Sequence, residues 1–249
     1  MPRVVSPAAE ALDRPPKMSE VLADRLRARI LGEGLPPGRT LSSEPEIIAR
    51  YRVGRATVRE ALRLLEADGL IEIRRGRGGG IVVREPDLGQ SSRSIALLLA
   101  MRGTTVRALC DYRLLIEPAA AAAAARNATK EQVRWLLELA EQPSEPNLGP
   151  AVDFHDALGE CSHNDLLRVS IAALVPELSW HVPGEALSPK DIAGTVRAHR
   201  ALARAVESGD AERARAIMRR HIEEFRRVLE RHGRLDQPIM PRERWLSRS

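Results

Sequence analysis

The spacing of hydrophobic residues changes near residue 70, and this change limits the folds open to the chain. Before that point, apolar residues recur three or four positions apart, which is the period of an α-helix. Ile71 and Ile73 then alternate with charged residues, and Ile81–Val83 follow a basic, glycine-rich tip, as in a β-hairpin. Three helices and a hairpin within about 65 residues are typical of a winged helix-turn-helix domain.

The helices of this first part are predicted from their start and stop signals. The first begins near Met18 and ends at the glycines of positions 32 and 34. The second begins at Ser43, where Glu46 has capping-box spacing, and ends near Tyr51. The third ends before Gly69. Its predicted buried face consists of Val58, Ala61, Leu62 and Leu65.

The rest of the chain shows helical periodicity only, which predicts an all-α bundle. We therefore expect a mainly α protein with these parts: a flexible arm (1–17), a winged helix-turn-helix domain (18–84), a linker (85–92), a helical domain (93–232) and a loosely held tail (233–249). The longest apolar runs are too short to cross a membrane, and no secretory signal is present. Two isolated cysteines indicate reduced thiols, so a cytoplasmic location is expected.

Arginines mark the third helix as a candidate DNA-reading element. Lysine occurs only at positions 17, 130 and 190, so nearly all of the 39 basic residues are arginine. Arg55, Arg59 and Arg63 form one stripe beside the buried face, and Thr57 lies in the first turn. A solvated helix face is the alternative interpretation. The hairpin tip favours DNA, because Arg74, Arg75, Arg77 and Arg84 are expected there without an acidic neighbour.

Three histidines in the helical part suggest a metal site. His199 and His221 lie on apolar faces of successive helices, at similar distances from the turn at Gly209. On antiparallel helices they are therefore level, and His155 on an earlier helix is a third member. Helical bundles build metal sites in this way, although a single histidine on an apolar face is more often a core residue.

The first part resembles the GntR family of bacterial transcription regulators across roughly 65 residues. The segments that carry the resemblance are Leu35–Gly38, Ser43–Glu44, Val53–Arg63 and Leu65–Ile71. The resemblance implies that Arg55, Thr57 and Arg59 on the third helix, and Arg75, Gly76 and Arg77 in the wing, contact operator DNA. Pro45 stands where the family usually has a further DNA-contacting arginine, so one contact is missing.

The second part resembles the FCD effector domain of the FadR subfamily over nearly all of residues 92–232. The matching segments are Arg113–Ala119, Phe154–Leu158, Asn164, Ala198–Ala201 and Met218–His221. The resemblance implies that His155, His199 and His221 bind a divalent metal, Zn or Ni, and that a small organic acid docks there with help from Arg113. The family's aspartate ligand is replaced by Ala151, so metal affinity is expected to be lower.

These observations predict a homodimeric regulator that binds palindromic operator half-sites and responds to an anionic metabolite, without a membrane or an enzymatic activity. Three alternatives stay open. One is a regulator with a metal-free pocket, and another is an architectural DNA-binding protein whose bundle only dimerises. The third is a metal-dependent hydrolase, which is disfavoured because the sequence has no HExxH motif.

Overall fold

A computed structural model describes residues 15–74, 76, 80–86, 88–142, 149–176, 181 and 187–240. The chain divides into two compact units, Met1–Asp87 and Leu88–Ser249, which we treat separately. The mainly α architecture predicted from the sequence is confirmed: a winged helix-turn-helix unit is followed by an all-helical unit. Within the described ranges, no helix combines the length and the apolar character needed to cross a bilayer.

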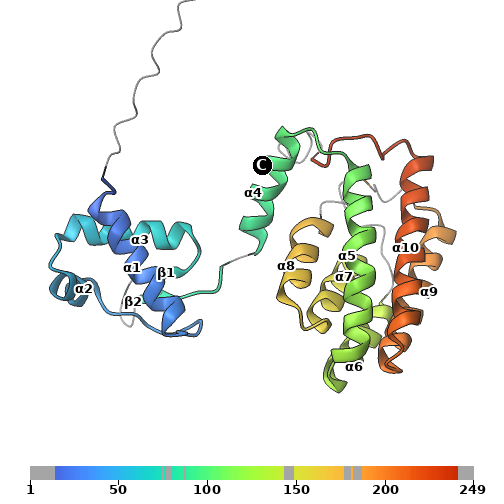
Figure 1. Ribbon diagram of the computed structural model, residues 1–249, viewed down its shortest axis with the longest axis horizontal. Coiled ribbons are helices and arrows are strands. Elements are labelled where there is room, and N and C mark those ends of the chain that lie inside the picture. The colour runs from blue at the N-terminus through green and yellow to red at the C-terminus, as the bar shows by residue number, and fades with distance from the viewer. Residues whose placement is uncertain are drawn as a thin grey trace, which may run out of the picture. The chain divides into compact units, whose positions relative to one another are not determined.

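The first unit contains three helices and one antiparallel hairpin (Figure 1). The elements are α1 (Met18–Gly32), α2 (Glu44–Tyr51), α3 (Arg55–Ala67), β1 (Ile71–Arg74) and β2 (Gly80–Val83). Ser43 caps α2 and exchanges capping-box hydrogen bonds with Glu46, as predicted. Arg52 then adopts a left-handed conformation, with φ of 55°, and ends α2 immediately before the turn into α3.

The core of this unit is formed by α1, α3 and the hairpin. All four residues predicted for the inner face of α3 are fully buried, and they pack with Leu22, Leu26 and Ile30 of α1. The hairpin pairs Ile71 with Val83 and is extended at its edge by residues 38–41, where Thr40 bridges to Val82. Burying one face of α3 in this way leaves its other face on the surface.

The second unit is built around the long helix α5. Its elements are α4 (Leu88–Met101), α5 (Val106–Asn127), α6 (Lys130–Glu141), α7 (Gly149–Cys161), α8 (Asp165–Leu174), α9 (Pro189–Glu207) and α10 (Ala211–Arg231). Helix α5 packs against α7, α8, α9 and α10, and its alanine tract lets these neighbours approach closely (Figure 1). The core includes Phe154, Leu202, Met218 and Ile222.

Two boundaries differ from those expected. Helix α4 begins at Leu88, inside the stretch predicted as a linker, and the buried hydroxyl of Ser92 in this stretch donates to the carbonyl of Ala173 on α8. Residues 233–240 are not a loose tail. Leu235 and Ile239 are buried, and the backbone of Val106 donates to the carbonyl of Gln237 at 3.0 Å. Tertiary contacts thus fix both segments.

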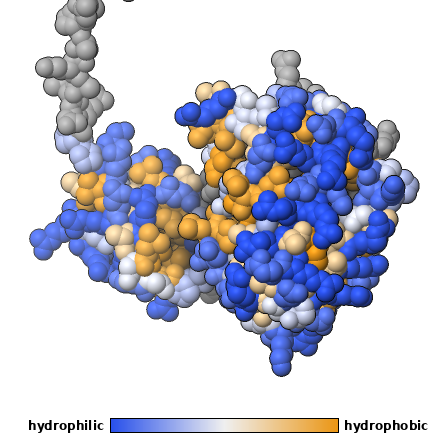
Figure 2. Space-filling view, turned by 45° about the vertical axis from the view of Figure 1, so that its right-hand side comes forward, coloured by the Kyte–Doolittle hydropathy of each residue, from blue (hydrophilic) through white to orange (hydrophobic). Residues whose placement is uncertain are grey.

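Exposed apolar side chains of the second unit are concentrated on helices that pack on one another. Helix α8 contacts both α4 and α5. The large exposed apolar residues of these three helices are Ile95, Leu97, Leu98, Met101, Leu115, Leu166 and Val169. Met101 and Leu166 are each 80% exposed. Figure 2 shows hydrophobic areas of this kind within a mainly hydrophilic surface.

Candidate functional site

The N-terminal turns of α3 present cationic groups to solvent. Arg55 and Arg59 are exposed, and Thr57 is half-buried. In the part of the chain that the structure describes, neither arginine has an ion-pair partner, whereas Arg63 pairs with Glu60 at 3.4 Å. Gly54 caps α3 without a side-chain hydrogen bond, and the first turn contains no acidic residue. This end of α3 therefore combines free N–H groups with two arginines, which suits an anionic partner.

The arginines beside the wing have an acidic neighbour, which the sequence analysis did not predict. Glu72 on β1 accepts hydrogen bonds from Arg74 at 3.1 Å and from Arg84 at 3.0 Å, and these bonds lower the pKa of its carboxyl group. The expectation that Arg74 and Arg84 lack an acidic partner was therefore wrong. Arg74 lies two residues from Glu72 on β1 and shares its face, whereas Arg84 lies two residues beyond Val82, the residue that pairs with Glu72 across the hairpin. Gly76 is described, with φ of 93°, whereas Arg75 and Arg77 lie outside the described residues.

The three predicted histidines come together inside the helical unit. His155 on α7, His199 on α9 and His221 on α10 are all buried, and one ring nitrogen from each lies within 4.8 Å of the others. The Nε2 atoms of His155 and His221 are 3.3 Å apart. Phe154 stacks on the His199 ring with centroids 4.1 Å apart, which holds that ring in place.

The Nε2 atom of His199 is an orphaned polar group. The His199 residue is only 3% exposed, and among the residues that the structure describes this buried atom has no hydrogen-bond partner. Burial, followed by the neighbouring His221, His155 and Arg113, keeps the pKa of His199 well below its ordinary value. Burial, together with His155 and Arg113, likewise lowers the pKa of His221 to about 3. Both rings are therefore neutral near pH 7 and offer lone pairs.

Glu117 is a member of the site that the sequence reading missed. Its buried carboxylate on α5 accepts a hydrogen bond from His155 Nδ1 at 2.5 Å and pairs closely with Arg113, one helical turn earlier. Burial alone raises the pKa of Glu117, but Arg113 and His155 outweigh it and hold the pKa well below the ordinary value. The sequence did offer one signal for Glu117: it lies four residues after Arg113 on the most alanine-rich helix, a spacing that brings two opposite charges together.

These residues fit a divalent transition metal. Two nitrogens bound at about 2.1 Å to one tetrahedral ion lie about 3.4 Å apart, close to the separation between His155 and His221. Because Glu117 engages Nδ1 of His155, the Nε2 atom of that ring carries the lone pair for a metal. Three neutral nitrogens suit Zn²⁺ or Ni²⁺. The site receives no carboxylate ligand from position 151, which is alanine.

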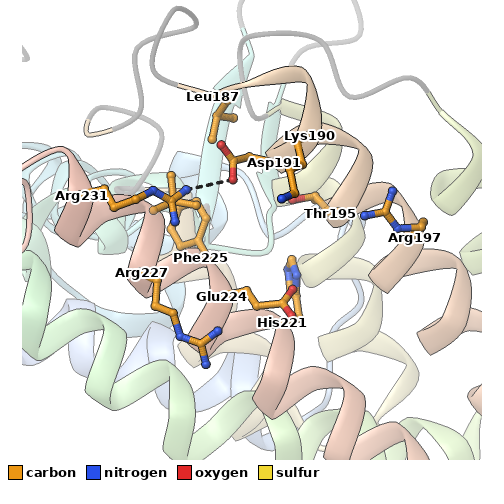
Figure 3. A pocket seen from close by; sticks show the side chains of 12 residues that line it. Leu187, Lys190, Asp191, Thr195, Arg197, His221, Glu224, Phe225, Arg227 and Arg231 are labelled. Carbon is orange, nitrogen blue, oxygen red and sulfur yellow. Dashed lines mark hydrogen bonds and ion pairs between the residues drawn. The ribbon is translucent and has the colours of Figure 1, made fainter.

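A cavity of about 240 Å³ between α9 and α10 reaches the cluster at His221. Its α9 wall includes Lys190, Thr195 and Arg197, and Figure 3 shows these residues following one another along the helix. On the α10 side, Arg231 is held by Asp191 at 3.0 Å, as the dashed line in Figure 3 marks. The cluster is therefore accessible to a small ligand from this side of the bundle.

Comparison with known proteins matches both units. The family described as bacterial regulatory proteins, gntR family, matches residues 18–81, and the FCD domain matches residues 108–224. The HTH-type transcriptional regulator LutR of Bacillus subtilis is 30% identical over 206 residues, which cover 78% of this chain and 93% of LutR. The HTH-type transcriptional repressor NanR of Citrobacter rodentium is 28% identical, with 83% of each chain covered.

One solved structure agrees with this assignment. The Streptococcus agalactiae GntR structure superposes with a TM-score of 0.69 at 27% identity, over 84% of this chain and 99% of that one. The gntR match falls on the winged helix-turn-helix unit, and the FCD match falls on the helical unit that contains the histidine cluster. The chain belongs to the GntR family of DNA-binding transcriptional regulators and carries an FCD domain after its winged helix-turn-helix domain.

Proposed function

We propose that this regulator binds palindromic operator DNA as a homodimer, and that a small organic acid bound at the histidine cluster changes its affinity for that DNA. The observation that carries the proposal is the convergence of His155, His199 and His221 on one buried point, together with the buried Nε2 atom of His199, which has no hydrogen-bond partner among the described residues. A buried cluster with an orphaned polar atom needs a partner, because leaving such a group unsatisfied costs about 1–3 kcal/mol.

The DNA-binding surface is proposed to consist of α3 and the wing. Arg55 and Arg59 would read base edges in the major groove, and Thr57 would contact a phosphate or a thymine methyl group. Their exposure and lack of ion-pair partners among the described residues support this role. Arg75, Gly76 and Arg77 in the wing would contact phosphates or the minor groove, where a glycine lets the backbone approach closely.

The effector site is proposed to use His155, His199 and His221 as ligands of one divalent metal, Zn or Ni. When bound, the metal supplies positive charge and open coordination positions for a carboxylate oxygen. Glu117 positions His155 through Nδ1, and Phe154 positions His199 by stacking. Arg113 Nη2 lies 3.5 Å from His155 Nε2, so an acid held at the cluster meets this guanidinium as well.

The homodimer is proposed to form through the apolar residues exposed on α4, α5 and α8. A palindromic operator requires two copies of the winged domain related by a two-fold axis. Four exposed leucines together with Ile95, Met101 and Val169, on helices that pack together, form the kind of surface that a second copy buries. Sedimentation of the full chain should give twice the 27.5 kDa mass, and Leu98→Asp should shift the protein toward the monomer.

The central experiment combines DNA selection with effector titration. Operator fragments are first selected from a random DNA pool with the full-length protein. Their affinity is then measured by gel shift with and without Zn²⁺, Ni²⁺ or a chelator, across a set of small carboxylates. Arg59→Ala should abolish the selected sequence preference, since each bidentate base contact contributes about 1–3 kcal/mol. Arg134→Ala removes an exposed arginine of the other unit and serves as the control.

Each outcome bears on a different part of the proposal. A carboxylate that changes operator affinity only with metal present supports the metal-dependent form. A carboxylate that acts equally after chelation supports the metal-free form, in which Arg113 and the histidines hold the acid alone; Ala151 in place of the usual aspartate ligand favours that alternative. If no acid in the set alters operator affinity in either condition, the effector proposal is wrong.

A further inference from the structure

Two cavities open along the groove between α9 and α10 and meet beside the histidine cluster. The first has a volume of about 240 Å³ and the second about 430 Å³. Arg197, His221 and Glu224 line both of them. The groove therefore runs from the floor, where His221 belongs to the cluster, to the outer part of α9, where Arg197 is exposed.

The groove carries more positive than negative side chains. The first cavity is lined by four cationic residues, Lys190, Arg197, Arg227 and Arg231, and by two acidic ones, Asp191 and Glu224. Asp191 is already paired with Arg231 at 3.0 Å. The second cavity adds Arg213 and Arg220 and no further acid. An anion in this groove meets a surplus of positive charge.

The buried floor of the groove also lacks negative charge. Arg113 and Glu117 neutralise each other, and histidines that bind a metal are neutral. With alanine at position 151, the protein supplies no carboxylate from that position to balance a divalent ion. A ligand carboxylate at the cluster would therefore supply negative charge that the floor lacks, and a second carboxylate would be balanced by the cationic side chains of the groove.

We propose that the effector is a small dicarboxylate, with one acidic group at the histidine cluster and the other in the groove beside Arg197 and Lys190. This inference rests on the proposed effector function and adds the class of acid and the residues that select it. Figure 3 places Lys190, Thr195 and Arg197 along one wall, from which their side chains can surround a second carboxylate. At about 240 Å³, the inner cavity is smaller than the roughly 300–1,000 Å³ of typical drug-sized pockets and suits a small metabolite.

Glu224 is expected to weaken dicarboxylate binding, so its removal should have the opposite effect to the removal of Arg197. Glu224 is exposed, lines both cavities and lies one turn beyond His221 on α10. Its carboxylate repels the second acidic group of a ligand in the groove. Replacing Glu224 by glutamine keeps the shape of the side chain and removes the charge, so dicarboxylate binding should become tighter.

The experiment compares succinate with butyrate by calorimetry on the full chain, with Zn²⁺ and after chelation. These acids have the same four-carbon length and differ in the second carboxylate. We expect the wild-type protein to bind succinate about tenfold more tightly than butyrate, and Arg197→Ala to remove most of that preference by weakening succinate binding much more than butyrate binding. Glu224→Gln should increase the preference. Arg204→Ala, an exposed arginine of α9 that does not line either cavity, should leave it unchanged.

The results separate this inference from the proposed function. Equal affinity for the two acids, or a preference that survives in Arg197→Ala, overturns the dicarboxylate assignment but leaves a carboxylate-responsive regulator in place. Failure of both acids to bind, together with failure of the wider carboxylate set to alter operator affinity, overturns the proposed function itself. Circular dichroism confirms that each variant is folded, and Arg197 is exposed, so its removal leaves the core intact.

Discussion

Removal of the Glu117 carboxylate should destabilise the helical unit strongly. Glu117 is 1% exposed and bonds both Arg113, which is also buried, and the Nδ1 atom of His155. In Glu117→Ala the Arg113 charge stays buried without a counter-ion. Breaking such a buried pair from one side costs about 3–5 kcal/mol. That loss is a large part of the roughly 5–15 kcal/mol by which domains are usually stable.

A double variant distinguishes the pair's net contribution from the penalty of an unpaired charge. Replacing both partners, as Arg113→Met with Glu117→Leu, removes two buried charges and keeps apolar volume. Such replacements are often neutral or stabilising by about 1–4 kcal/mol. The double variant should therefore be clearly more stable than Glu117→Ala, and its remaining loss should not exceed the roughly 1–3 kcal/mol that the unpaired Nδ1 of His155 costs. It should still bind metal about 10- to 100-fold more weakly, because His155 loses the group that orients it.

Urea unfolding followed by tryptophan fluorescence measures these differences. All three tryptophans, at positions 135, 180 and 245, belong to the second unit, so the signal reports on that unit alone. The pKa of Glu117 lies below its ordinary value of 4.5, so its contribution is fully present above that pH and is lost as pH falls through the folded-state pKa. The loss of unfolding free energy in Glu117→Ala should thus be equal at pH 7 and pH 6. A loss under about 1 kcal/mol in the single variant, or equal losses in single and double variants, would refute the argument.

Three further predictions concern the metal site, the C-terminal segment and the wing. Ala151→Asp places a carboxylate one helical turn before His155 and should raise Zn²⁺ affinity at least about tenfold; unchanged affinity in a competition titration would argue against a metal at the cluster. The Nε2 atom of His181 donates to the carbonyl of Ile239 at 3.0 Å, and burial lowers the pKa of His181 below its ordinary value of 6.5. The contribution of His181 to the stability of the folded state is therefore fully present above pH 6.5 and declines as the pH falls below that value. The protection factors of the Val106, Arg107 and Ile239 amides, calculated against the intrinsic exchange rate at each pH, should therefore fall at pH 5, and His181→Gln should flatten that dependence. Arg75→Ala and Arg77→Ala should weaken binding to all DNA sequences alike and reduce the salt dependence by about one ion per lost phosphate contact; a loss confined to one sequence would mean that the wing reads bases.

Local signals in the sequence were sufficient for the helices, the hairpin and the meeting of the histidines. Caps and glycines act within one turn, so the start of α2 at Ser43 and the buried face of α3 follow from residues a few positions apart. His199 and His221 meet because two helices joined by a tight turn must run antiparallel, which makes equal distances from Gly209 equivalent to equal height. A regular period and a short connection fix such geometry before any tertiary contact forms.

Tertiary structure decided the features that depend on residues far apart in the chain. Glu117 meets His155 across 38 positions, Ser92 meets Ala173 across 81, and Arg107 meets Asp236 across 129. No periodicity encodes these pairs, since each requires two helices or segments to pack at one particular height and rotation. Packing therefore extended α4 into the expected linker and docked residues 233–240. Packing also brought the Glu117 carboxylate of α5 to His155, on a helix where the sequence alone had indicated only Arg113 as a site residue.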